Sequence, residues 1–296
     1  MDFDTFSFLL APFAASLILT GIHAYLGVHV VERGVIFVDL SLDQIAALGA
    51  TIALLMPISQ GDPHGPVVYW ISLGFTFIGA AVFSMIRTRR ARIPQEAIIG
   101  ICYAVASAAA FLAMSKATSE SEHLKDMLVG NILAVSWAEV LKTALLYGAI
   151  GTFHFVFRHK FLAISMDPQR AEAEGISIRL WDFLFYASFG FVVTSSVSIA
   201  GVLLVFCYLI VPSVAAMLYA DSIGRRLAIG WTMGTIVSAL GVYMSLLLDL
   251  PTGATIVCTF GLVLIAMAAV RPLFRRSLAA DLHQVGYSDR AHGTTH

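Results

Sequence analysis

The sequence predicts an all-α fold, a polytopic bundle of eight or nine transmembrane helices. Of the 296 residues, 58% are hydrophobic and only 12% are charged, whereas a soluble domain carries about 25% charged residues. Most of the chain must therefore lie in lipid. A membrane helix uses about 20 apolar residues, so this composition allows about eight or nine spans. The net charge of −1 also argues against a nucleic-acid-binding surface, which needs a local excess of Lys and Arg.

Nine apolar stretches account for the predicted spans. They are residues 6–31, 35–57, 67–86, 94–114, 139–157, 182–198, 200–219, 227–248 and 253–270. The sixth and seventh are separated only by the small-residue turn at Ser198–Gly201, so a broken helix there would reduce the number to eight. The apolar piece Leu128–Ser136 is too short to cross a bilayer and fits a half-helix that dips into the protein.

The basic residues predict the orientation of the chain. Of the 18 Lys and Arg residues, 15 fall on one side of the predicted spans, and such an excess marks the cytoplasmic side. The C-terminus is then cytoplasmic and, with nine spans, the N-terminus lies outside, without the basic segment of a cleaved signal peptide. We expect residues 1–276 to form one membrane domain. The polar residues 277–296, which include three His, are expected to be a disordered cytoplasmic tail rather than a metal sensor.

Motifs for nucleotide binding and hydrolysis are absent from the sequence. Neither G-x-x-x-x-G-K-[S/T], G-x-S-x-G nor H-E-x-x-H occurs. The chain is therefore predicted not to be an enzyme and to hold no cofactor of its own, so any ATP-driven work would need a partner. Cys102, Cys207 and Cys258 lie inside apolar runs and indicate neither a disulfide framework nor a zinc site.

Two acidic residues lie deep in the second predicted span. Asp39 and Asp43 are four residues apart and share a helical face, and Gln44 follows the second of them. At about 1.5 Å per residue, Asp43 lies on the order of 12 Å into the span, near the midplane. Because an intramembrane charge costs ~2.5–3.5 kcal/mol on insertion scales, a transported cation would explain the two carboxylates. The alternative is that one or both pair with a helix end or with an Arg such as Arg33.

The histidines and the other acids give weaker signals. His23 and His29 in the first span are additional candidate metal ligands, and His154 lies in the fifth. A buried neutral His, however, more often bonds to a neighbouring carbonyl or hydroxyl. The acids near predicted span ends are expected to be interfacial or helix-N-terminal charges; they are Glu96, Glu139, Asp182 and Asp249.

Small residues predict close helix packing in two spans. Gly230, Gly234 and Ser238 recur every four residues in the eighth span, and Ala104 and Ala108 do so in the fourth. The pattern leaves open whether the neighbouring helix belongs to the same chain or to another copy.

A short helix is predicted in the cytoplasm between the fifth and sixth spans. Asp167 suits the N-cap, Pro168 the first helical position and Gly175 the stop, while Glu172 and Glu174 favour the helix between them. A helix of about two turns is marginal in water on its own. It therefore needs something to dock against, and a partner protein is the natural candidate.

Several motifs in order resemble one family, the membrane-spanning subunit of the ATP-binding-cassette (ABC) importers for zinc, manganese and iron. The resemblance runs from about Gly27 to Val270. Its motifs are Gly130–Ser136, Gly201–Pro212 with Ala215 and Ala216, and Gly241–Ser245 with Asp249–Ala254.

The resemblance implies a type II ABC importer-like permease fold in the cell (inner) membrane. It implies a homodimer, one ATPase subunit per copy and an extracytoplasmic metal-binding protein, with ATP on the partner driving a divalent metal through the dimer interface. The helix at about 167–175 looks like the family's coupling helix. The candidate ATPase-coupling residues are thus Asp167, Pro168, Arg170, Ala171 and Gly175.

One departure from the family concerns the metal ligands. Family members typically carry an Asp and a His four residues apart early in the second span. A gap-free alignment over 27–49 places Leu40 and Gln44 at those positions. Asp39 and Asp43 each lie one residue earlier, about 100° around the helix.

Two explanations of this departure remain open. Either the helix is rotated or shifted so that the two carboxylates take over, or Gln44 keeps the family position with Asp43 beside it. Both give an oxygen-rich site, which suits manganese, ferrous iron or magnesium better than zinc. Zinc would need His23 or His29 to complete the shell.

Two other classes of function fit parts of the sequence. An ion-coupled secondary metal carrier would use Asp39 and Asp43 as its relay, but it would leave the short cytoplasmic helix without a purpose. An intramembrane enzyme would hold a metal tightly through Asp39, Asp43 and a His. The motif series and the asymmetry of basic residues favour the importer subunit.

Overall fold

The computed structural model describes residues 3–59, 65–86, 94–115 and 132–271, and every regular element within these ranges is helical. The predicted all-α fold is confirmed for this part of the chain. The helices are α1 (Phe3–Glu32), α2 (Val38–Leu55), α3 (Pro66–Ile86), α4 (Gln95–Met114), α6 (Trp137–Val156), α7 (Arg158–Met166), α8 (Pro168–Ala173), α9 (Ile178–Ala200), α10 (Val202–Met217), α11 (Ile223–Leu248) and a last helix, Thr252–Arg271.

Each of the nine predicted apolar stretches coincides largely with a helix, but these helices are not equally suited to span a membrane. Seven helices are long and apolar enough, namely α1 from Leu9, α2, α3, α4, α9, α11 and the last helix. α6 and α7 are long and apolar enough only when they are taken together. They are bent by 73° at the break between them, and the pair would make an eighth span. α10 has only 16 residues. It follows α9 at Gly201, whose φ of 75° favours glycine.

Two other predicted segments are described in part or not at all. Of the predicted half-helix 128–136, Ile132–Ala134 forms a short 3₁₀ helix, and residues 128–131 lie outside the described residues. The tail 277–296 also lies outside them. Its predicted disorder therefore stays a prediction.

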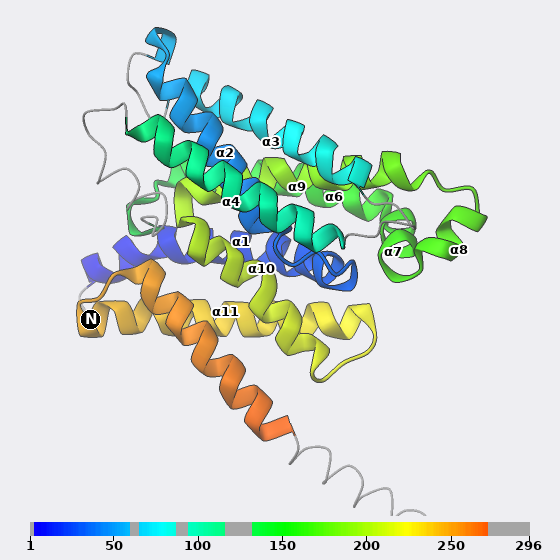
Figure 1. Cartoon of the computed structure of the whole chain (residues 1–296). Helices are drawn as coiled ribbons and strands as arrows, with labels where there is room; N and C mark the ends of the chain where they lie inside the picture. The colour runs from blue at the N-terminus through cyan, green and yellow to red at the C-terminus, as the bar shows by residue number, and fades with distance from the viewer. Residues whose placement is uncertain (1–2, 60–64, 87–93, 116–131, 272–296) are drawn as a thin grey trace, which may run out of the picture.

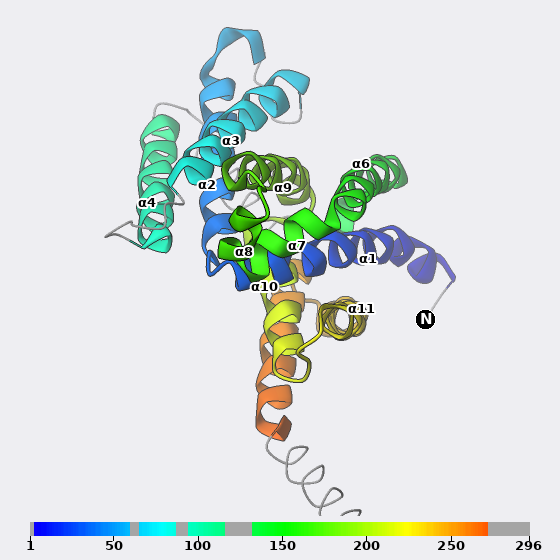
Figure 2. The same ribbon diagram turned by 90° about the vertical axis from the view of Figure 1, so that its right-hand side faces the viewer.

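The helices pack in two groups that α9 connects. In one group α2 packs on both α3 and α4, and in the other α1 packs on α10, α11 and α6 (Figure 1). α9 packs on α3 and also contacts α2, α6 and α10. Figure 2 shows the last helix projecting from the rest of the bundle. Its apolar side chains, such as Leu262 and Ile265, are exposed in the single chain.

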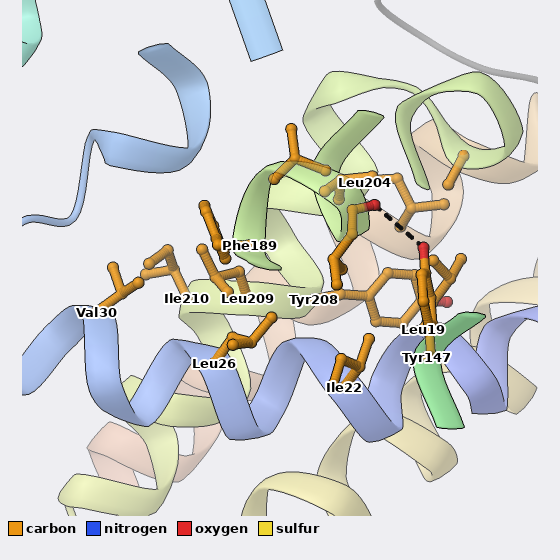
Figure 3. Close-up of a cluster of buried hydrophobic side chains, with 14 of the residues drawn as sticks. Leu19, Ile22, Leu26, Val30, Tyr147, Phe189, Leu204, Tyr208, Leu209 and Ile210 are labelled. Atoms are coloured by element: carbon orange, nitrogen blue, oxygen red, sulfur yellow. Dashed lines mark hydrogen bonds between the residues drawn. The ribbon is translucent and has the colours of Figure 1, made fainter. Parts of the chain in front are cut away.

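Part of the core lies at the contact between α1 and α10. One face of α1 carries apolar residues at three- and four-residue spacing, which places them in a single stripe against α10 (Figure 3). The buried residues of this contact are Leu19, Ile22, Leu26, Val30, Leu204, Tyr208, Leu209 and Ile210. The buried hydroxyl of Tyr147 on α6 donates to the carbonyl oxygen of Val192 at 3.2 Å, and the hydroxyl of Tyr208 forms a hydrogen bond with that of Ser238 at 3.0 Å, so both polar atoms are satisfied.

Glycines let α1 approach two neighbouring helices closely. A Cβ added to Gly27 would lie 1.9 Å from the carbonyl oxygen of Leu209 on α10, and one added to Gly234 on α11 would lie 2.4 Å from a side chain of α1. The small-residue groove predicted in the eighth span therefore packs within the same chain. The other predicted small residues, Ala104 and Ala108, lie on an exposed face of α4.

Replacing Gly27 with Ala is expected to destabilise the protein. The added Cβ would meet backbone of α10, which cannot rotate away, so the two helices must separate, and such overpacking costs ~1–3 kcal/mol. We expect a lower thermal unfolding midpoint of the purified protein in detergent. Gly21→Ala on the same helix is the matched control, because its Cβ would have nothing within 4 Å. Equal midpoints for the two variants would contradict the close helix crossing.

Candidate functional site

The start of α2 carries the two carboxylates that were predicted to hold a cation. Asp39 lies in the first turn and Asp43 one turn later on the same face. Both residues are 0% exposed. Neither oxygen of either carboxylate has a hydrogen-bond partner among the described residues. Because buried carboxylates without partners are costly, the pair is chemically suited to bind a cation.

The turn between α1 and α2 fixes the position of this pair. Gly34 adopts a φ of 65°, which few residues other than glycine tolerate, and the amide of Val38 donates to the carbonyl oxygen of Val35 at 3.0 Å. Glu96 in the first turn of α4 accepts a hydrogen bond from the amide of Phe37 at 3.0 Å. Glu96 was predicted as a helix-end charge, and its carboxylate binds the start of a neighbouring helix.

Gln44 faces a different neighbour from the two carboxylates. Its Oε1 accepts a hydrogen bond from the hydroxyl of Ser107 on α4 at 3.1 Å. One residue of offset turns a side chain by about 100° around a helix. The structure therefore separates Gln44 from Asp39 and Asp43, which face the interior.

The candidate histidines of α1 interact with other groups. Nδ1 of His23 bonds to the carbonyl oxygen of Leu19 at 2.8 Å, one turn earlier in the same helix. Nδ1 of His29 bonds to the hydroxyl of Ser165 on α7 at 2.8 Å. Among the described residues, no three or more His, Cys, Asp or Glu side chains come close enough together to hold a metal. Each candidate His thus has a hydrogen bond through Nδ1, while its buried Nε2 has no hydrogen-bond partner among the described residues.

The predicted cytoplasmic helix is present as α8, with both ends capped. Oδ1 of Asp167 accepts a hydrogen bond from the amide of Arg170 at 3.0 Å, and Pro168 occupies the first helical position. At the other end Gly175 has a φ of 78°, and the amides of residues 175 and 176 bond to the carbonyls of residues 172 and 171. This is the Schellman pattern, which satisfies the last carbonyls of a helix.

α8 presents a polar outer surface. Arg170 and Glu174 form an exposed ion pair at 2.8 Å, four residues apart. Gln169, Glu172 and Ala173 are exposed as well, and Ala171 is the buried residue of this helix. α8 is therefore anchored to the chain by one small side chain and leaves most of its surface to solvent.

One buried ion pair corrects two expectations from the sequence. Arg33, which was a candidate partner for the carboxylates of α2, forms an ion pair with Asp182 of α9 at 2.6 Å, and both side chains are 0% exposed. Asp182 was expected to be an interfacial or helix-N-terminal charge and is instead fully buried, in the second turn of α9. The sequence places the two residues 149 positions apart, so only helix packing brings them together. By contrast Glu139 caps the start of α6 as predicted, through a capping box with Ser136.

The multi-pass helical bundle, with a carboxylate pair buried in one helix and an exposed capped helix between two others, defines the architecture of a membrane permease. Residues 5–271 match the ABC 3 transport family, and the chain belongs to that family. The predicted resemblance to the membrane-spanning subunits of metal ABC importers is thereby confirmed. As a permease, the chain is not the catalytic component of an ABC system.

Similar proteins agree with this assignment, and a solved structure has a similar fold. The chain is 28% identical over 202 residues to the manganese transport system membrane protein MntC of Listeria innocua, covering 66% of this chain and 71% of that protein. It is 27% identical over 194 residues to the chelated iron transport system membrane protein YfeC of Yersinia pestis, covering 63% and 66%. Its fold matches PsaBC from Streptococcus pneumoniae in complex with Fab, with a TM-score of 0.74 and 22% identity, covering 89% of this chain and 92% of that chain.

Proposed function

We propose that this chain is the permease subunit of an ABC importer that moves a divalent transition metal, Mn²⁺ or Fe²⁺, into the cytoplasm. The observation that carries the proposal is the pair Asp39 and Asp43, fully buried in α2 without a hydrogen-bond partner among the described residues. Two carboxylates at this depth repel each other and lose hydration unless a cation compensates them. In a member of the ABC 3 transport family, a transported cation accounts for the pair.

The donor chemistry favours manganese or ferrous iron over zinc. Carboxylate oxygens are ligands that suit Mn²⁺ and other hard divalent ions, whereas zinc prefers His and Cys. Among the described residues no His, Cys or Glu side chain joins Asp39 and Asp43 in a group of three possible ligands, which supports the same choice. The names of MntC and YfeC, which refer to manganese and to chelated iron, point in this direction as well. Water would supply the remaining ligands.

The proposal includes the partners that such an importer needs. α8 would dock on a separate ATPase subunit, because it is exposed, capped at both ends and borne by a chain without a phosphate-binding loop. A second copy of the chain would complete the permease, and an extracytoplasmic protein would deliver the metal. The complex would lie in the cell (inner) membrane with the C-terminus of this chain in the cytoplasm.

The test is metal uptake by the reconstituted complex. The permease, its ATPase and its binding protein are placed in liposomes, and uptake of radioactive Mn²⁺ is measured with and without ATP at the ATPase. Uptake that requires ATP, and that unlabelled Fe²⁺ inhibits more strongly than Zn²⁺, is the expected result. Uptake driven by a proton or sodium gradient without the ATPase would instead identify an ion-coupled carrier.

A further inference from the structure

A buried cluster of three side chains joins the end of α1 to the segment that contains α8. Nη1 of Arg33 donates to Oδ1 of Asp182 on α9 at 2.6 Å, and Nε of the same guanidinium donates to the hydroxyl of Ser165 on α7 at 2.9 Å. The guanidinium carbon lies 4.0 Å from the centre of the Phe185 ring. A planar guanidinium can make such directed bonds in two directions while it stacks on an aromatic face.

Hydrogen bonding through Ser165 adds His29, a residue of α1, to this cluster. The Ser165 hydroxyl donates to the carbonyl oxygen of Phe161 at 2.9 Å and lies 2.8 Å from Nδ1 of His29. A hydroxyl has one hydrogen and can accept two hydrogen bonds. All three bonds form together when Arg33 and His29 both donate to Ser165. The last turn of α1 and the residue that follows the helix are thus bound to α7 through His29 and Arg33.

The cluster lies on both sides of α8 in the sequence. Ser165 is two residues before the N-cap Asp167, and Asp182 is in the second turn of α9, seven residues after Gly175. Both partners bind the same guanidinium. The two ends of the segment 165–182 are therefore both bound to Arg33, and the exposed helix α8 lies between them. Figure 1 shows α7 and α8 together at one end of the bundle.

The cluster also leads directly to the carboxylates of α2. Arg33 is six residues before Asp39, and the turn between them is held by the backbone bond from Val35 to the carbonyl oxygen of Val30 at 3.2 Å and by the bond from Phe37 to Glu96. No long flexible loop separates Arg33 from α2. A displacement of α8 that moves Ser165 and Asp182 must therefore be accommodated where α2 begins.

From this arrangement we propose that Arg33, Ser165 and Asp182 form a coupling cluster, which transmits movement of α8 to the carboxylate pair of α2. The inference rests on the proposed function, because it takes α8 as the ATPase dock and Asp39 and Asp43 as the metal site. The three are positioning residues, since they are proposed to act through α8 and α2 and not as ligands of the metal. Their role is to make α2, which carries the metal site, move together with the docking helix α8.

The test replaces the ion pair with apolar residues and measures coupling in the reconstituted complex. A buried ion pair can often be replaced by apolar residues of similar size without loss of stability, so Arg33→Met/Asp182→Leu preserves packing while it removes the directed bonds. We expect the double variant to assemble with the ATPase and to hydrolyse ATP, but to import at least ~fivefold less Mn²⁺ per ATP than the unmodified complex. Ser165→Ala should lower the same ratio.

A neighbouring ion pair provides the matched control. Glu32, the residue before Arg33, forms an ion pair with Arg226 and so joins α1 to α11. Glu32→Gln/Arg226→Gln should leave the amount of Mn²⁺ imported per ATP unchanged. The proposal is overturned if Arg33→Met/Asp182→Leu keeps the unmodified ratio. It is also overturned if assembly, hydrolysis and uptake fall together, because a structural role alone explains that. Failure of ATP-driven uptake in the unmodified complex would reject the proposed function instead.

Discussion

Replacing Asp43 with Asn is expected to abolish metal uptake and, at the same time, to stabilise the metal-free protein. Asp43 is fully buried and its carboxylate has no hydrogen-bond partner among the described residues. Loss of a direct ligand should reduce uptake by more than the ~10–100-fold that follows the loss of an outer-shell group. The amide is similar in size but uncharged, so the cost of burying a charge without a partner disappears.

Two measurements on the same variant separate these effects. Uptake of Mn²⁺ is measured in the reconstituted complex, and the thermal unfolding midpoint is measured in detergent with and without Mn²⁺. We expect a higher midpoint without metal and a smaller rise on adding Mn²⁺, because a ligand stabilises only the state that binds it. Asp249→Asn is the control, since Asp249 is exposed and Asn tolerates its φ of 52°. Normal uptake by Asp43→Asn would remove this residue from the metal pathway.

Replacing Ala173 with Trp is expected to prevent docking of the ATPase. Ala173 lies in the last turn of α8 and is exposed, so a larger side chain there does not disturb the packing of the chain itself. A partner cleft shaped around a small side chain would be overpacked, which costs ~1–3 kcal/mol, or about 5–150-fold in affinity. ATP-driven uptake should fall with the affinity, while the unfolding midpoint of the isolated permease stays unchanged.

The docking prediction is checked by measuring the dissociation constant of the permease and the ATPase in detergent. Ser198→Trp is the matched control, because Ser198 is also exposed but lies near the other end of α9, ~30 Å from α8 along that helix. Unchanged affinity in Ala173→Trp, or an equal loss in Ser198→Trp, would show that the ATPase binds elsewhere.

The helices and α8 could be predicted from the sequence because their causes are local. Apolar stretches of sufficient length indicate spans whatever their neighbours are. The caps of α8 likewise depend on Asp167, Pro168 and Gly175, which lie within nine residues of one another. The shared face of Asp39 and Asp43 follows from helical periodicity alone. These features needed no knowledge of tertiary structure.

The partners of these side chains could not be predicted, because they depend on how the helices pack. Periodicity shows that Gln44 lies about 100° from Asp43, but it does not show that this direction faces Ser107 on α4. In the same way the sequence marks Arg33 and Asp182 as charges near span ends. Their ion pair exists only because the fold brings the residue that follows α1 against α9. The only signal in the sequence was that each charge needed a partner.

The central claim, that the metal passes the carboxylate pair of α2, is tested most directly by Asp43→His. This substitution gives Asp39 a His four residues later, which is the spacing typical of the family that the sequence resembles. Because zinc prefers imidazole to carboxylate ligands, we predict that the ratio of Zn²⁺ to Mn²⁺ uptake by the reconstituted complex rises in this variant. A ratio equal to that of the unmodified complex, with uptake retained, would contradict the claim.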